Sequence, residues 1–190
     1  GTYAINRALD MPDIRNRILS RNSQPHSPTI AIHGAGNAGL YAGLENIKRG
    51  RRVMIISDSK NAIVSKRESG FTREEFEIIM QMKAKGKSLM EAAEQIHASN
   101  SSDPSVTLVE IIPGEAGTKA VLAADVDILI LAALENTITM DNVRDVKAPL
   151  IVELANGPIT EEADRWLFEQ RDEQLGKHKH WVLADSLASA

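Results

Sequence analysis

The sequence contains no cysteine, which excludes disulfide bonds, zinc–thiolate centres and a thiol nucleophile. It also has no excess of positive charge. A net charge of -4 and a pI of about 5.8 argue against a general nucleic-acid or anionic-membrane binder. No apolar run approaches the ~20 residues that span a bilayer, and the first residues do not have the layout of a signal peptide. We therefore expect a cytoplasmic protein with no nucleic-acid or membrane partner.

Metal-ligand spacing is also lacking among the five histidines, so no metal site is predicted. Internal repeats and low-complexity tracts are missing as well. What remains is an ordinary globular balance, with 43% hydrophobic and 25% charged residues in 190 positions. This length predicts one domain. Because the chain begins inside a predicted helix and stops abruptly after the last predicted strand, we expect a domain taken from a longer chain.

Predicted strands and helices alternate along the chain. Apolar, β-branched runs predict strands over 29–33, 51–58, 125–134, 148–156 and 180–187, with a strand or extended segment over 106–113. Helical spacing, N-capping residues and glycine stops predict helices over 1–20 with a break at Pro12, and over 37–49, 72–86, 88–99, 114–124, 139–146 and 160–176. This order predicts an α/β fold: a Rossmann-like, doubly wound, mostly parallel sheet with helices on both faces. Its ligand site should lie at the carboxyl ends of the strands.

The first predicted strand leads into a G-x-G-x-x-G pattern formed by Gly34, Gly36 and Gly39. A helix follows, and Asp58 ends the next strand, 58 − 39 = 19 residues after the last glycine. In a dinucleotide fingerprint, the first glycine permits the turn, the second lets the pyrophosphate approach, and the third lets the helix pack on the sheet. The alternative is a structural turn followed by a surface aspartate.

Asp58 bears on the choice of cofactor. Its carboxylate can accept hydrogen bonds from the hydroxyls of the adenosine ribose and would repel a 2′-phosphate, which favours NAD. Ser57, Ser59 and Lys60 lie beside it and could receive a phosphate, so NADP is not excluded.

Four segments resemble a known family: "TIAIHGAGNAG", "VMIISDSKNAI", "VDILILAALENTIT" and "VKAPLIVELANGPITEEAD". The sequence is similar to the coenzyme-binding domain of glutamate dehydrogenase, within the Glu/Leu/Phe/Val dehydrogenase superfamily. The resemblance implies a single NAD(P)-binding domain over 1–190, in which 1–20 is the entering helix and 29–190 the Rossmann-like core.

The resemblance also implies a role for each matching position. The pyrophosphate would lie on Gly36, Asn37 and Ala38 within the loop from Gly34 to Gly39, and the adenosine ribose on Asp58 and Ser59. The nicotinamide half would be contacted by Ala132, Ala133 and Asn156. Structural alternatives stay open. The two alanines could be small because helices pack there, and "NGP" also favours a turn. Glu135 and Glu153 could be an acid/base pair or carboxylates with structural partners. His33 could touch a phosphate or be a satisfied strand residue.

The activity implied is NAD(P)-dependent, reversible oxidative deamination of L-glutamate to 2-oxoglutarate and ammonia. The family's catalytic lysine and aspartate belong to the other domain, so this chain is expected to bind cofactor without being active alone. The parent would be a hexamer, and the fragment a monomer or weak dimer.

The sequence departs from the family pattern at several positions. Leu131 replaces a usual proline, Leu154 a usual glycine, and Thr137 a usual glutamine. Ala184 and Ser189 also differ. The departures at Leu131, Leu154 and Thr137 motivate one alternative, a non-catalytic nucleotide-sensing or assembly relative. A second alternative, a dehydrogenase for branched or aromatic amino acids, stays open because the resemblance places most of the substrate pocket in the other domain.

Overall fold

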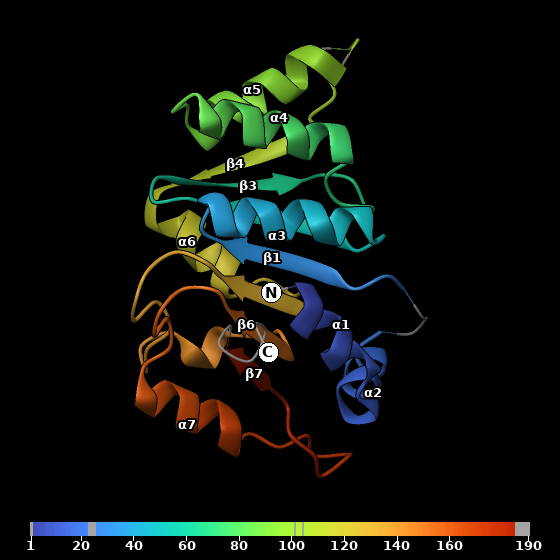
Figure 1. The fold of residues 1–190 in the computed structure, drawn as a ribbon, viewed down its shortest axis with the longest axis vertical. Helices are drawn as coiled ribbons and strands as arrows, with labels where there is room; N and C mark the ends of the chain where they lie inside the picture. The colour runs from blue at the N-terminus through green and yellow to red at the C-terminus, as the bar shows by residue number, and fades with distance from the viewer. Residues whose placement is uncertain (1, 23–25, 101, 104, 185–190) are drawn as a thin grey trace.

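Seven strands form one sheet in the order β4-β3-β2-β1-β5-β6-β7 in the computed structural model, which describes residues 2–22, 26–100, 102–103 and 105–184 (Figure 1). The strands are β1 (Thr29–His33), β2 (Arg52–Ser57), β3 (Asn61–Ser65), β4 (Val109–Pro113), β5 (Ile128–Leu131), β6 (Leu150–Glu153) and β7 (Trp181–Ala184). β1 pairs in parallel with β2 and β5, and β5–β6 and β6–β7 are parallel too. β3 is antiparallel to both β2 and β4, so it alone among these strands runs in the opposite direction.

Helices cover both faces of this sheet. One face carries α1 (Thr2–Asp10), α2 (Pro12–Ser20), α3 (Asn37–Lys48), α4 (Arg73–Ala84) and α5 (Leu89–Asn100). The other carries α6 (Gly114–Leu122), the 3₁₀ turn η1 (Val143–Asp145) and α7 (Glu161–Glu169). Because strand side chains alternate between faces, β1 buries Ile30 and Ile32 in the first core and Ala31 in the second. The predicted α/β class and mostly parallel, doubly wound sheet are confirmed.

Two helices, α4 and α5, begin with a capping box, as the predicted N-capping residues require. Glu75 donates its backbone N–H to Thr72 Oγ1 at 3.1 Å, and Glu75 Oε2 accepts from the backbone N–H of Thr72 at 2.9 Å. Ser88 and Glu91 make the same two contacts at the start of α5. These reciprocal bonds satisfy amide groups that a helix leaves unpaired in its first turn.

Three local predictions need correction. The antiparallel strand β3 was not predicted, because its five residues follow closely on β2. The helix expected over 160–176 ends at Glu169, where Gln170 turns extended and the chain folds back so that Arg171 bridges His178. The helix expected over 139–146 is a single 3₁₀ turn. The predicted positions 185–187 and Ser189 lie outside the described residues.

Candidate functional site

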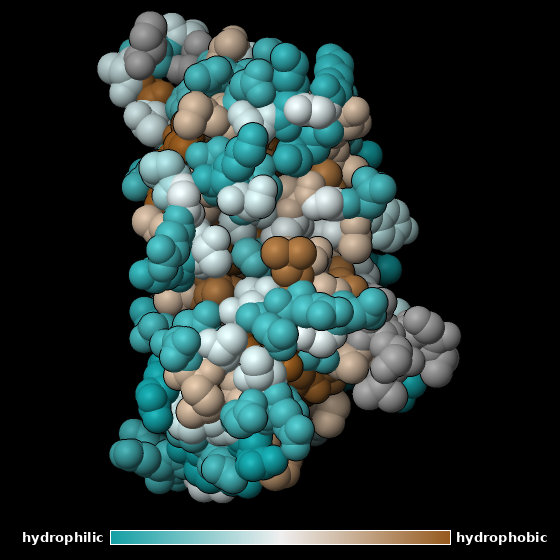
Figure 2. All heavy atoms as spheres, turned by 90° about the vertical axis from the view of Figure 1, so that its left-hand side faces the viewer, coloured by the Kyte–Doolittle hydropathy of each residue, from teal (hydrophilic) through white to brown (hydrophobic). Residues whose placement is uncertain are grey.

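A cavity of about 1350 Å³ lies over the carboxyl ends of β1, β2 and β5. Figure 2 faces this end of the molecule and shows apolar side chains exposed in the middle of a largely hydrophilic surface. The chain leaves β1 here between two neighbours, β2 on one side and β5 on the other. In a doubly wound sheet this is the switch point at which ligands bind.

The glycine turn forms one wall of the cavity. Gly34 has a φ of +115° and donates its N–H to the Ser57 carbonyl at 2.9 Å. A Cβ on Gly34 would lie 2.6 Å from the Ala132 carbonyl carbon, so the turn is pressed between the ends of β2 and β5. Only glycine fits this combination of conformation and contact.

The other two glycines have different surroundings. A Cβ on Gly39 would overlap the Gly34 carbonyl oxygen, so α3 sits directly against the turn. Gly39 is buried and does not line the cavity, so it allows close packing of α3 and does not contact a ligand there. Gly36 is exposed, lines the cavity and has no atom within 4 Å of a Cβ position. Together with exposed Asn37 and Ala38, it presents the first amide groups of α3 to the cavity, an arrangement that favours an anion.

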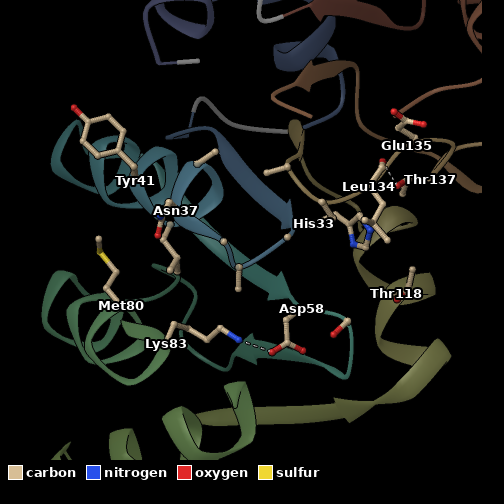
Figure 3. A pocket seen from close by; sticks show the side chains of 18 of the residues that line it. His33, Asn37, Tyr41, Asp58, Met80, Lys83, Thr118, Leu134, Glu135 and Thr137 are labelled. Atoms are coloured by element: carbon tan, nitrogen blue, oxygen red, sulfur yellow. Dashed lines mark hydrogen bonds and ion pairs between the residues drawn. The ribbon is translucent and has the colours of Figure 1, made fainter. Parts of the chain in front are cut away.

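Asp58 faces the same cavity, but both of its carboxylate oxygens are already hydrogen-bonded (Figure 3). Oδ1 accepts the backbone N–H groups of Lys60 and Asn61, each at 2.9 Å, and closes the turn between β2 and β3. Oδ2 accepts from Lys83 Nζ at 3.0 Å. Burial acts to raise the pKa of Asp58, but the two amide bonds and the Lys83 ammonium outweigh it, and the pKa is lowered.

Lys83 was missed by the sequence analysis. It lies on α4, 25 residues after Asp58, and only the fold brings it to the cavity. No spacing rule of the glycine fingerprint points to it. Ser59 follows Asp58 in the chain and is exposed at the rim of the same cavity. The Lys83 ammonium and the Ser59 hydroxyl are both groups that can bind a phosphate.

His33 lines the cavity and is buried. Its Nδ1 lies 2.9 Å from Ser57 Oγ, which is fully buried. Burial lowers the pKa of His33, so the imidazole is neutral at pH 7.

A second cavity of about 760 Å³ adjoins the first and is formed by the loops after β5 and β6. The predicted residues Ala132, Ala133 and Asn156 line it, and the two alanines line both cavities. Leu134, which is 72% exposed, also lines both. Asn136 has a φ of +50° and donates its N–H to the Gly157 carbonyl at 2.9 Å, which ties the two loops together.

The positions that depart from the family pattern have different places. Leu131 is fully buried in the α6–α7 core and lines neither cavity, so it does not obstruct the site. Thr137 donates its hydroxyl to the Leu134 carbonyl at 2.8 Å. Leu154 lines the second cavity and is therefore the departure that bears on ligand fit.

Glu153 ends β6 but lines neither cavity. Burial and the nearby Asp164 raise the pKa of the Glu153 carboxyl. Glu135 is exposed and lines both cavities.

Among the described residues no group of three or more potential ligands could hold a metal ion. Within the same residues, no helix combines the length and apolar character needed to cross a membrane.

The sequence pattern of the Glutamate/Leucine/Phenylalanine/Valine dehydrogenase family matches residues 14–190. The chain belongs to this family. Two of its relatives are the NADP(+)-dependent glutamate dehydrogenase of Pyrobaculum calidifontis, 38% identical over 145 residues, and the NAD-specific glutamate dehydrogenase of Staphylococcus aureus, 29% identical over 150. These alignments cover 75% and 79% of the chain, and 30% of each relative.

The fold agrees with this family. The crystal structure of Plasmodium falciparum glutamate dehydrogenase superposes with a TM-score of 0.68 at 18% identity, covering 97% of this chain and 32% of that one. The chain thus spans about a third of the length of the family members it matches.

Proposed function

We propose that the chain is the NAD(P)-binding part of a glutamate dehydrogenase, which catalyses reversible oxidative deamination of L-glutamate to 2-oxoglutarate and ammonia. The observation that carries the proposal is the open glycine turn at the start of α3. Gly36 has free space where a side chain would stand, and exposed amide groups follow it. This is the arrangement that lets a pyrophosphate approach the backbone. Relatives bearing glutamate dehydrogenase names support the reaction.

In this proposal the two cavities divide the dinucleotide. Asn37 and Ala38 hold the pyrophosphate, which links the two halves of the dinucleotide. The first cavity takes the adenosine half beside Asp58 and Ser59, and the second takes the nicotinamide half beside Asn156. Bound NAD(P) supplies hydride transfer. The chain's own residues orient the dinucleotide and exclude water from one side of it.

The acid and base of the reaction are proposed to lie outside this chain. The titratable side chains that line the cavities are His33, Tyr41, Asp58, Lys83 and Glu135. His33 is buried against Ser57, and Asp58 is engaged by Lys83 and two amides. Glu135 and Tyr41 lie exposed at the rim. The isolated chain should therefore show no glutamate-dependent reduction of NAD(P)+, and a steady-state rate from it would contradict this assignment.

Lys83 supports acceptance of NADP as well as NAD. Both oxygens of Asp58 are occupied, so its negative charge is partly offset before any ligand arrives. A 2′-phosphate on the adenosine ribose would lie in reach of the Lys83 ammonium and the Ser59 hydroxyl. Lys83 can leave Asp58 for the phosphate because its side chain is long and flexible.

Calorimetric titration of the chain with NAD+, NADH, NADP+ and NADPH tests the proposal. Lys83→Met should weaken NADP+ binding about tenfold, and NAD+ binding much less, because one charge-assisted contact is lost. Lys85→Met is the matched control, since Lys85 lies near the end of α4, exposed and outside the cavity lining. Equal losses in the two variants would contradict the role of Lys83.

A second candidate rests on Leu154. Its side chain lines the second cavity, and a branched residue there narrows the space for the nicotinamide ring. A nucleotide-sensing relative without dehydrogenase chemistry would bind adenosine phosphates, and the nicotinamide half would add no affinity. Equal affinity for ADP-ribose and NAD+, together with tighter NAD+ binding by Leu154→Gly, would favour this candidate. Absence of binding to all four dinucleotides would refute the primary proposal.

A further inference from the structure

Two buried polar residues, His33 and Ser57, lie side by side at the carboxyl ends of β1 and β2. They are on the face of the sheet that α6 and α7 cover. The pairing register places Ser57 opposite His33, and His33 opposite Leu131. Neighbours in register on parallel strands point to the same face, and Leu131 belongs to the core under α6 and α7. A buried histidine and a buried serine on this face are not explained by packing alone.

The hydrogen bond between them fixes which nitrogen of His33 carries the proton. Ser57 is fully buried, and its hydroxyl has no partner other than His33 Nδ1 within the described part of the chain. A buried hydroxyl without an acceptor is unfavourable, so the hydroxyl hydrogen goes to Nδ1. A neutral imidazole has one N–H, and Nε2 therefore carries it.

That Nε2–H group is directed to the first cavity. Among the described residues Nε2 has no hydrogen-bond partner, and it is not among their fully enclosed, unpaired polar atoms. The residue lines the first cavity and not the second. Figure 3 shows the imidazole near Thr118 of α6 and Leu134 of the loop after β5. In this view these side chains lie on the opposite side of the site from Tyr41 and Met80 (Figure 3).

We infer that His33 is a specificity residue for the base of the dinucleotide, with its Nε2–H donating to an acceptor nitrogen of the adenine ring while Ser57 holds the imidazole in the required tautomer. The inference rests on the proposed dinucleotide function. A purine ring offers acceptor nitrogens in its plane and apolar faces. The first cavity offers the N–H donor of His33 together with Thr118 and, where it borders the second cavity, Ala132 and Leu134. An N–H donor placed in a mostly apolar wall selects the orientation of a flat ring.

Titrations of the full 190-residue chain with ADP-ribose and with nicotinamide mononucleotide test the inference. His33→Phe keeps a flat ring and removes the donor, and it should weaken ADP-ribose binding about five- to tenfold. Nicotinamide mononucleotide has no adenine, so its affinity for His33→Phe should equal its affinity for the unaltered chain. His33→Gln restores an N–H donor and should recover most of the affinity. Ser57→Ala should give an intermediate loss, because it frees the tautomer without removing the ring.

The outcomes separate the inference from the proposed function. If the unaltered chain binds NAD(P)+ and His33→Phe binds ADP-ribose equally well, the role of His33 is refuted and the proposed function stands. Equal losses for ADP-ribose and nicotinamide mononucleotide would refute it too, because they indicate a structural effect. If the unaltered chain binds no dinucleotide, both are refuted. Thermal unfolding of each variant checks that the fold is retained, and the Gln and Ala variants decide the matter if the Phe variant does not fold.

Discussion

Two glycines of one turn should respond oppositely to the same substitution. Gly36→Ala places a methyl group in open space at a φ of −83°, which alanine tolerates. Reduced freedom of the unfolded chain stabilises by about 0.4–1 kcal/mol. Alanine is a poorer N-cap than glycine, which offsets this gain. The net change in unfolding free energy should stay below about 1 kcal/mol, while binding suffers because the methyl group stands where the pyrophosphate approaches.

Gly39→Ala has the opposite balance. Its methyl group would overlap the Gly34 carbonyl oxygen, a backbone atom that cannot turn aside, and would also press on Ile32. Overpacking costs about 1–3 kcal/mol, and a backbone obstacle places this site at the upper end. For a chain of this length about 3 kcal/mol lowers the unfolding temperature by about 6–12 °C.

Calorimetric binding and chemical denaturation of both variants provide the assay. Gly36→Ala should unfold near the midpoint of the unaltered chain and bind NAD+ at least about tenfold more weakly, a loss of about 1.4 kcal/mol. Gly39→Ala should unfold earlier. Unchanged NAD+ affinity in Gly36→Ala would refute the pyrophosphate cradle. Unchanged stability in Gly39→Ala would refute the close seating of α3.

Four further outcomes concern stability. Thr72→Ala removes the N-cap of α4 and should lower the unfolding free energy by about 1 kcal/mol, as measured by denaturant titration. Phe76→Ala empties a fully buried site between α3 and α4 and should cost about 3–5 kcal/mol in the same assay. The pKa of Asp58 is lowered on folding, so its contribution is present above the ordinary value of 3.8 and is lost as the pH falls through the folded value. Asp58→Asn should therefore be less stable than the unaltered chain at pH 7, and the difference should shrink as the pH falls below 3.8. The raised pKa of Glu153 has the reverse sign: stability is lost as the pH rises above the ordinary value of 4.5. Glu153→Gln should thus stabilise at pH 7 and not in acid, and a loss of stability at pH 7 would contradict this.

The sequence was sufficient for the parallel strands because they are nearly continuous apolar runs. β1 and β5 are buried on both faces, and such strands have few alternatives. β3 was missed for a physical reason. Asp58 and Lys60 look like cofactor-site residues, but Asp58 also accepts the amide hydrogens that reverse the chain. The structure shows the turn contacts of Asp58, and its contact with a cofactor stays a prediction.

The candidate site was predictable in part. Gly34, Gly36 and Asp58 could be placed because a fingerprint fixes their spacing along the chain. Lys83 and the orientation of His33 could not, because they depend on how α4 and β2 lie against β1. The end of α7 was also unpredictable: the polar residues after Glu169 suit a helix, but the chain folds back there in the bridge between Arg171 and His178.

Under the proposed function, the contacts of Asp58 with Lys83 and with two backbone amides couple cofactor preference to folding. A substitution at Asp58 made to change nucleotide preference would also remove the acceptor that reverses the chain between β2 and β3, so any gain in binding would carry a stability penalty. Ser59 is exposed and has no such structural duty among the described residues. Change of preference in this chain, by natural drift or by engineering, is therefore most accessible through Ser59 and Lys83, with Asp58 left in place.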